Sequence, residues 1–375
     1  MTLVNSSART EVGQVRPAFV DDATVAAVET EIARTLDSLR ASWTDLAAAV
    51  VPREGVLHTD SVLDLLEAMV HSGGKRFRPR MAHWGWVAAG GHRTGRGHDD
   101  VVRVGTALEL LHVFALIHDD VMDASETRRG RPSVHASARQ QHVALNGSGD
   151  AQRYGENIAI LAGDLAHSEA GVVVAGLPRP LQELWRTLTV ELMMGQGRDL
   201  VGAANGRRDL GHAREVARAK SGAYTVWRPL QLGAVAGGAR PETLAALERY
   251  GVAVGEAFAL RDDILGVIGD SRATGKPVGD DLVAGKPTVL LALATQQFTP
   301  RWRRALTRAA SGHASAGLIA SLQAELVRSG VIAQVEAMIR DAVATAFLAL
   351  DDPAVDPDAA VGLQALARRV AWRET

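Results

Sequence analysis

Two clusters of aspartate stand out because each follows a strongly apolar segment. The first is Asp119, Asp120 and Asp123 after ELLHVFALI, and the second is Asp262 and Asp263 after GEAFALR. Carboxylates beside an apolar helix surface are costly unless their charge is compensated. Oxygen-only ligands suit Mg²⁺, which typically takes one or two protein carboxylates together with phosphate oxygens of a substrate. A solvated helix end would explain one cluster alone, but two clusters predict metal sites that bridge to phosphate.

The spacing differs between the two clusters. On a helix Asp119 and Asp123 are four residues apart, so both carboxylates project from one face. The position four residues after Asp262 is Gly266, so a third carboxylate has to come from elsewhere. The following Gly-rich segment, typical of a flexible lid that brings cations to a polyphosphate, supplies candidates and two lysines: Asp270, Asp280, Asp281, Lys276 and Lys286.

Two compact basic segments accompany the aspartates. GGKRFRPR places Lys75 and Arg78 after a Gly-Gly turn that opens a helix, whose N-terminus adds partial positive charge. ETRRGRPSVH lies just past the first cluster and offers Arg128 and Arg129, whose guanidinium groups can bind phosphate in a bidentate way. Neither segment has the interleaved aromatics of a single-strand nucleic-acid groove. Together with apolar helix behind the acids, these groups point to two diphosphate substrates with hydrocarbon tails.

The composition agrees with a small-molecule enzyme. Among 375 residues, Lys plus Arg total 41 and Asp plus Glu total 43, so the net charge of -2 favours neither nucleic acid nor an anionic membrane as a partner. Cysteine is absent, which excludes a disulfide framework, a thiolate metal site and a Cys nucleophile and fits a reducing cytoplasm. We find no secretory signal and no stretch of the ~18 to 20 apolar residues that a spanning helix needs. We therefore expect a cytoplasmic protein without a membrane span.

Apolar residues recur at mixed spacings of three and four, and strand-like alternation is nearly missing. Hydrophobic residues make up 47% of the chain and aromatics only 4%, which favours closely packed helices rich in Ala, Leu and Val. The expected helices cover residues 23–50, 60–71, 76–90, 100–123, 155–176, 180–200, 212–237, 241–268, 286–297, 300–311, 314–328 and 330–350. We expect an all-α protein, with residues 1–22 as an N-terminal extension that need not be ordered and residues 23–375 as one domain.

Five ordered motifs between residues 60 and 295 resemble those of the trans-isoprenyl diphosphate synthases, also called polyprenyl synthetases. They are GGKRFRPR, LHVFALIHDDVMD followed by RRG, GQGRDL, KSGAY, and FALRDDILGVIGD followed by GKPVGDDLVAGKPT. The resemblance implies a single helical domain of the isoprenoid synthase type with a deep central cavity, usually assembled as a homodimer. It also implies Mg²⁺-dependent head-to-tail condensation of isopentenyl diphosphate with an allylic diphosphate, with release of diphosphate.

The same resemblance implies roles for individual residues. Asp119, Asp120 and Asp123 would hold Mg²⁺ against the allylic diphosphate from one wall, and Asp262 and Asp263 from the opposite wall. The positions that match the isopentenyl diphosphate site are Lys75, Arg78, His112 and Arg129. Those that match the allylic diphosphate site are Arg128, Lys220, Lys276 and, where the family has Thr or Ser, Ser221; Gln196 lies in the GQ motif beside the cavity. Lys220 is counted with the aspartates as catalytic.

Product length is expected to depend on residues one turn before Asp119, because the hydrocarbon tail must run down between helices from the metal site. Phe114 and Ala115 occupy these positions, and Phe114 is large enough to narrow the cavity. An aromatic residue five positions before a first motif of minimal length resembles geranylgeranyl diphosphate synthases. The expected product is therefore the C20 diphosphate, with C15 or longer products as alternatives, and plain core packing is the alternative role for Phe114.

Two departures from the family pattern leave other activities open. The second motif reads DDILG rather than DDxxD because of Gly266, and the usual Gln three residues before it is Ala259. A noncatalytic partner subunit of a heteromeric synthase would tolerate both changes. A class I terpene cyclase would share the helical cavity and the Mg²⁺ chemistry, but it does not need a second diphosphate site.

Overall fold

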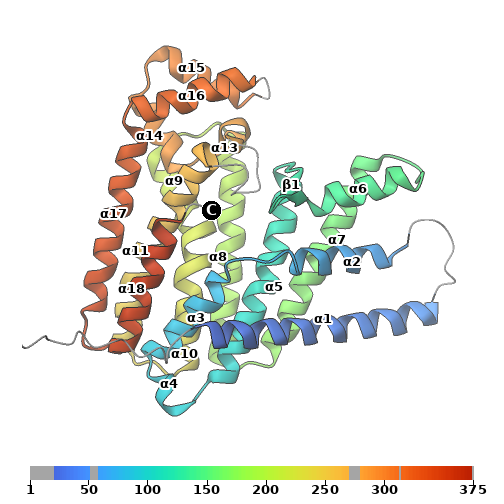
Figure 1. Ribbon diagram of the computed structural model, residues 1–375, viewed down its shortest axis with the longest axis vertical. Helices are drawn as coiled ribbons and strands as arrows, with labels where there is room; N and C mark the ends of the chain where they lie inside the picture. The colour runs from blue at the N-terminus through green and yellow to red at the C-terminus, as the bar shows by residue number, and fades with distance from the viewer. Residues whose placement is uncertain (1–20, 51–57, 270–278, 312–313, 374–375) are drawn as a thin grey trace, which may run out of the picture.

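Helices make up almost all of the computed structural model, which describes residues 21–50, 58–269, 279–311 and 314–373 (Figure 1). The helices are α1 (Asp22–Val50), α2 (Asp60–Val70), α3 (Phe77–Ala88), α4 (Gly91–Thr94), α5 (His98–Met122), α6 (Val134–Ala144), α7 (Ala151–Ala175), α8 (Arg179–Ala204), α9 (Leu210–Val216), the π-helix η1 (Ala217–Trp227), α10 (Arg228–Ala236), α11 (Pro241–Ile268), α13 (Asp280–Ala284), α14 (Val289–Gln297), α15 (Pro300–Ala309), α16 (Ala316–Arg328), α17 (Val331–Leu350) and α18 (Pro357–Ala371). A two-stranded antiparallel hairpin pairs β1 (Thr127–Arg128) with β2 (Arg131–Pro132). The expected all-α class is confirmed.

Most expected helices are present within a few residues of their predicted ends. The prediction missed four helices: α4 and α13, which span about one turn; α6, whose amphipathic periodicity is weak; and α18, which was overlooked although it buries a regular apolar face. It also treated residues 212–237 as one regular helix, whereas the chain there passes through α9, η1 and α10. Residues 1–20 lie outside the described part of the chain, so the N-terminal extension stays a prediction.

The long helices lie side by side, with α1 crossing them at one end of the molecule (Figure 1). Their buried faces form three apolar clusters that are built mainly from Ala, Leu and Val. Helix α5 contributes residues to two of these clusters. Helix α11 contributes to one of the same two clusters and also to the third, so both helices are central. At the end of the bundle marked by β1 and α13, these two helices present the predicted aspartates (Figure 1).

Small residues set the position of η1 between α8 and α11. A Cβ placed on Gly195 of α8 would lie 2.6 Å from the backbone nitrogen of Lys220, so the two helices touch through their backbones. A Cβ on Gly222 would lie 2.9 Å from the carbonyl oxygen of Gly255 on α11. These close crossings bring Lys220 next to the residues that follow Gly195 and opposite the second Asp cluster.

Replacing Gly222 with alanine is expected to destabilise the protein by about 1–3 kcal/mol, because the new methyl group would have to push α11 away from η1. Thermal unfolding followed by circular dichroism measures the change. Gly171→Ala is the matched control, since a Cβ at Gly171 on α7 meets no atom within 4 Å and alanine favours a helix. Wild-type thermal stability in the Gly222→Ala protein would show that the crossing accommodates a side chain.

Two helices contradict the expectation that no segment is long and apolar enough to span a membrane. By length and composition alone, α5 and α7 pass that test. In the folded chain 67% of the apolar window of α5 is buried, as in the core helix of a soluble protein, but only 33% of the α7 window is buried. Helix α7 therefore leaves much of its apolar surface uncovered in the single chain.

Candidate active site

The first Asp cluster lies at the C-terminal end of α5. Asp119 and Asp120 belong to its last turn, and Asp123 caps the helix with its N–H donating to the Asp119 carbonyl at 2.8 Å. The continued helical conformation places Asp123 one turn beyond Asp119, as the spacing predicted. Asp120 is only 1% exposed, whereas Asp119 lines a cavity.

Lys220 joins η1 to this cluster. Its Nζ donates to Asp119 Oδ1 at 3.0 Å and to Asp199 Oδ2 at 2.5 Å, and Gln196 Nε2 approaches the same Asp119 oxygen at 3.5 Å. Burial opposes the charge of Lys220, but the carboxylates of Asp119 and Asp199 raise its pKa above the ordinary value. Lys220 therefore carries a positive charge beside Asp119 at neutral pH.

Arg128 compensates the buried carboxylate of Asp120. Its Nε donates to the two carboxylate oxygens at 3.0 and 3.1 Å. The next residue, Arg129, has φ 54° and Gly130 has φ 73°, as in the tight turns that match the twist of a two-residue hairpin. This turn sends the guanidinium of Arg129 away from Asp120, to donate to Ser72 Oγ at 2.8 Å and to the Gly73 carbonyl. Adjacent arginines thus serve different parts of the site.

A second cationic group, formed by Lys75, Arg78, His112 and Arg129, lines the same cavity. Arg78 donates to Thr225 Oγ1 at 2.9 Å and lies over the Tyr224 ring at 4.1 Å. Burial and then the charge of Arg78 lower the pKa of His112 well below its ordinary value, so its imidazole is neutral at pH 7. The buried His112 Nδ1 has no hydrogen-bond partner among the described residues.

Glu109, which the sequence did not single out, places one negative charge among these cations. It is 4% exposed and accepts a hydrogen bond at 2.6 Å from Arg76, which takes the left-handed conformation at φ 51°. His112 and Leu116 follow Glu109 on α5 by about one and two turns, and all three line the cavity. A buried ion pair of this kind holds the loop before α3 against α5.

The second Asp cluster faces the cavity from α11. Arg373, which follows α18, forms an ion pair with Asp262 and lies over the Phe258 ring at 4.1 Å. Asp263 is 8% exposed and accepts a hydrogen bond from the Leu290 N–H at 3.2 Å. Burial, with repulsion from Asp281, raises the pKa of the Asp263 carboxyl well above its ordinary value. A cation bound beside Asp263 would favour the charged form of this carboxyl.

Lys286 lies between Asp123 and Asp281. Its Nζ donates to Asp123 Oδ2 at 2.6 Å and lies 4.0 Å from Asp281 Oδ1. Burial opposes its charge, but Asp281 and Asp119 raise the pKa of Lys286 above the ordinary value. Asp123 is thus linked to the cavity by its hydrogen bond with Lys286. The sequence identified Lys286 only as one of the lysines of the Gly-rich segment.

These groups surround one cavity of about 680 Å³. The sequence-predicted residues that line it are Lys75, Arg78, His112, Asp119, Arg128, Arg129, Lys220, Ser221, Ala259, Asp262, Asp263 and Gly266. Asp120, Asp123 and Gln196 lie behind this lining and reach it through Arg128, Lys286 and Asp119. Lys276 and Asp270 lie outside the described residues.

The two residues predicted to limit product length are not part of the lining. The α5 residues that line the cavity are Glu109, His112, Leu116 and Asp119. Phe114 points to another side of α5, where its ring centroid lies 4.6 Å from that of His118 and 4.9 Å from that of His167 on α7. Ala115 is likewise absent from the lining. A role for Phe114 and Ala115 in product length therefore stays a prediction.

Three residues of the site were missed by reasoning from sequence: Glu109, Asp199 and Arg373; Lys286 was named there only as one of the lysines of the Gly-rich segment. Asp199 lies in the GQGRDL motif, but the sequence gave this residue no role of its own. Glu109 is an acid inside the apolar run of α5, and that position was the signal that could have found it. No signal in the sequence pointed to Arg373, because only the packing of α18 on α3 and α11 brings this residue to Asp262.

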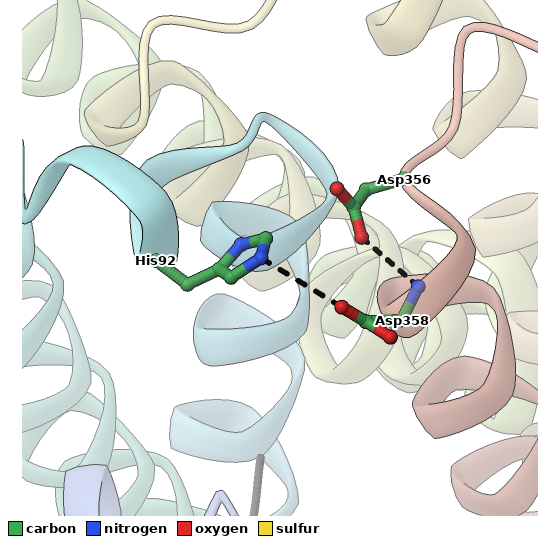
Figure 2. A group of neighbouring side chains, drawn as sticks. All are labelled: His92, Asp356 and Asp358. Carbon is green, nitrogen blue, oxygen red and sulfur yellow. Dashed lines mark hydrogen bonds and ion pairs between the residues drawn. The ribbon is translucent and has the colours of Figure 1, made fainter. Parts of the chain in front are cut away.

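Another group of metal-binding residue types lies in a different part of the chain. His92 Nε2 lies 4.0 Å from Asp358 Oδ2, and Asp356 accepts a hydrogen bond from the Asp358 N–H at 2.9 Å (Figure 2). Asp356 is the N-cap of α18 and also pairs with Arg93 at 2.5 Å. These contacts fasten α4 to the start of α18 and have the form of a helix cap.

Comparisons with known proteins agree with this geometry. The model of the polyprenyl synthetase family matches residues 59–325. A short chain isoprenyl diphosphate synthase of Methanothermobacter thermautotrophicus is 33% identical over 66% of this chain and 71% of its own length. A geranylgeranyl diphosphate synthase of Mycobacterium tuberculosis is 33% identical over 80% of this chain and 81% of its own.

A solved structure is also similar throughout the chain. It is a geranylgeranyl pyrophosphate synthase from Corynebacterium glutamicum, complexed with isoprenyl diphosphate and magnesium. The TM-score is 0.88 at 35% identity, and the match covers 95% of this chain and all of the other. The protein therefore belongs to the polyprenyl synthetase family, as the ordered motifs indicated, and is a prenyltransferase.

Proposed function

We propose that this prenyltransferase condenses isopentenyl diphosphate head-to-tail with an allylic diphosphate, in a Mg²⁺-dependent reaction that releases diphosphate. One observation carries the proposal. A single cavity brings carboxylates of α5 and α11 together with two separate cationic groups, one beside the carboxylates and one around His112. Two diphosphates with a metal between one of them and the acids would satisfy both groups.

The donor set fits Mg²⁺. The charged groups that face the cavity from α5 and α11 are carboxylates, Asp119 on one side and Asp262 and Asp263 on the other, and hard oxygen ligands suit this ion. We assign Asp120 and Asp123 to the same metal-binding face as Asp119. Asp120 accepts hydrogen bonds from Arg128, Asp123 accepts one from Lys286, and both of these cations line the cavity. When bound, Mg²⁺ supplies positive charge that helps the allylic diphosphate to depart.

The side chains then divide the work between the two substrates. Arg128, Lys220 and Ser221 bind the allylic diphosphate, together with Lys276, and stabilise the charge that develops as the allylic C–O bond breaks. Lys75, Arg78 and Arg129 bind the diphosphate of isopentenyl diphosphate, and the neutral His112 donates an N–H to it. The isopentenyl double bond attacks the allylic carbocation, and the released diphosphate accepts the proton that is lost. No protein nucleophile is needed.

We propose geranylgeranyl diphosphate, C20, as the main product. The sequence pattern supports this length, because Phe114 is an aromatic residue five positions before the first Asp cluster, a pattern that resembles geranylgeranyl diphosphate synthases; its ring packs on His118 and His167, on another side of α5 from the diphosphate cavity. The names of the Mycobacterium tuberculosis and Corynebacterium glutamicum relatives give the same product. Farnesyl or longer-chain diphosphates are the alternatives.

The other activities considered have less support. A class I terpene cyclase has no use for the cationic group formed by Lys75, Arg78, His112 and Arg129, which is complete here. The hypothesis of a noncatalytic partner subunit was supported only by the presence of Gly266 and Ala259. Both positions face a cavity that, among the described residues, is lined by Asp119 and five predicted cations: Lys75, Arg78, Arg128, Arg129 and Lys220.

A homodimer is proposed as the working assembly, with a second copy of this chain covering α7 and α8. Leu161 and Val172 of α7 are 54% and 63% exposed, and Met194 and Val201 of α8 are 52% and 59% exposed. Apolar surface on two long helices is typical of a subunit interface. Sedimentation velocity is expected to give twice the mass of 39.7 kDa. A monomer at micromolar concentration would contradict the assembly.

A cytoplasmic location without a membrane span is proposed as well. The cysteine-free chain suits a reducing compartment. Burial of 67% of the α5 window favours a core helix, and a partner copy would cover α7.

The function is tested by incubating the purified protein with Mg²⁺, isopentenyl diphosphate and, in parallel, dimethylallyl, geranyl, farnesyl or geranylgeranyl diphosphate. Products are read by mass. A C20 diphosphate from the three shorter starters is expected. Longer products would keep the reaction and overturn the product length, and no elongation from any starter would overturn the proposed function.

A further inference from the structure

Helix α11 supplies only two carboxylates to the cavity. Asp262 and Asp263 lie four and three residues before Gly266, so a side chain at position 266 would project from the same face of the helix. Gly266 also lines the cavity. A second metal-binding cluster with the sequence DDxxD would have its third carboxylate at position 266 of α11, and this chain has glycine there.

A carboxylate from another element occupies the space in front of Gly266. A Cβ placed on Gly266 would overlap Asp281 Oδ2 and would lie 2.6 Å from Asp281 Cγ and 3.2 Å from Oδ1. No side chain at 266 is compatible with Asp281 in this position. Glycine is thus the residue that lets the Asp281 carboxylate stand where an acid at 266 would stand.

Helix α13 is built to hold Asp281 against α11. Gly279 and Gly285 bound this short helix with φ 83° and 63°, conformations that glycine adopts without strain. Leu282 is completely buried in the apolar cluster that α11 shares with α14–α17. This anchor fixes the orientation of the residue before it, Asp281, which lines the cavity.

The charges nearby place Asp281 opposite the first Asp cluster. Lys286 Nζ lies 2.6 Å from Asp123 Oδ2 and 4.0 Å from Asp281 Oδ1, so one cation lies between carboxylates that come from α5 and from α13. Asp281 therefore belongs to the wall that α11 forms. Its carboxylate lines the same cavity as Asp262 and Asp263.

We propose that Asp281 supplies the third carboxylate of the second metal-binding cluster, in place of the acid that Gly266 lacks. This inference rests on the proposed function and names a residue of the same site. The second cluster then keeps three carboxylate ligands despite its DDILG sequence, because the third carboxylate is on α13 instead of at position 266 of α11. Full synthase activity is expected from this chain despite Gly266.

The test is an exchange of the carboxylate between the two positions. Binding of inorganic pyrophosphate in the presence of Mg²⁺ is measured by titration calorimetry, and thermal unfolding is measured without ligand. Asp281→Asn keeps the shape of the side chain and is expected to weaken binding about 10- to 100-fold. Gly266→Asp alone is expected to lower the unfolding temperature, because the new side chain overlaps Asp281.

The double variant Asp281→Gly with Gly266→Asp is the decisive protein. It is expected to unfold at a higher temperature than Gly266→Asp and to bind Mg²⁺-pyrophosphate at least about tenfold more tightly than Asp281→Asn. Asp99→Asn is the charge control, since this residue of α5 lies far from the cavity with a side chain that is 98% exposed. It should bind and unfold like the wild type.

The possible results separate the two proposals. Wild-type affinity in a folded Asp281→Asn protein, or a double variant that regains neither stability nor affinity, would overturn the role of Asp281 while the wild type still condenses its substrates. A wild-type protein that neither binds Mg²⁺-pyrophosphate nor elongates any starter would overturn the proposed function, and the role of Asp281 with it.

Discussion

Replacing Asp119 with asparagine is expected to lower kcat for condensation by about 10²- to 10³-fold, because the change removes a negatively charged metal ligand at the leaving diphosphate. The fold should survive. Asp119 lines the cavity, and its partner Lys220 keeps a second carboxylate, Asp199, at 2.5 Å. Initial rates at saturating substrates, with thermal unfolding as the check on folding, measure the effect.

Asp99→Asn is again the control on the same helix, where it removes an equal charge at the opposite end of α5. Asp120→Asn would be a poorer test, because it leaves the buried Arg128 without its carboxylate partner and would cost stability too. Unchanged turnover in a folded Asp119→Asn protein would contradict the metal-binding role of this residue.

Replacing Phe114 with alanine is expected to shift the main product from C20 to longer chains. Phe114 packs on His118 of α5 and His167 of α7, so its removal leaves a void between these two helices, into which we expect a longer tail to extend. The lining of the diphosphate cavity should be unaffected, because Phe114 takes no part in it. Product masses from farnesyl diphosphate and isopentenyl diphosphate give the result.

Phe347→Ala is the matched control for Phe114→Ala. Phe347 is also a partly buried aromatic residue, but it belongs to α17, and its ring centroid lies 4.8 Å from the Arg368 guanidinium of α18. Both variants should lose stability, and only Phe114→Ala should lengthen the product. An unaltered product spectrum would make Phe114 a residue of the core alone.

The fold could be predicted from the sequence where amphipathic periodicity was strong. Helices α2 and α17 each bury one regular face, and their ends were close to the prediction. The long apolar runs of α5 and α11 are buried on most sides and were recognised by their length and apolar content. Helix α6 was missed because its amphipathic periodicity is weak, whereas the regular apolar face of α18 could have been recognised. The π-helix was missed for a related reason: nothing in the residues 212–237 distinguishes it, and close contacts of Gly222 with Gly255 set its geometry.

Most residues of the candidate site could be predicted from the sequence, but the contacts between them could not. The residue types and the family motifs named the aspartates and cations that line the cavity. They could not say that Lys286 would bridge Asp123 and Asp281, or that Arg373 would pair with Asp262, because the Lys286–Asp123 and Arg373–Asp262 contacts each join residues more than 100 positions apart. Choosing Asp281 among the candidate third carboxylates likewise needed the close approach of α13 to α11.

The most direct test of the central claim is the balance between diphosphate release and carbon–carbon bond formation. Purified protein with Mg²⁺ and farnesyl diphosphate is assayed for released diphosphate with and without isopentenyl diphosphate. The account predicts one diphosphate released for each isopentenyl unit incorporated, and none without isopentenyl diphosphate. Release from farnesyl diphosphate alone, with a hydrocarbon or alcohol product, would contradict it, because the cationic group around His112 would then bind no second substrate.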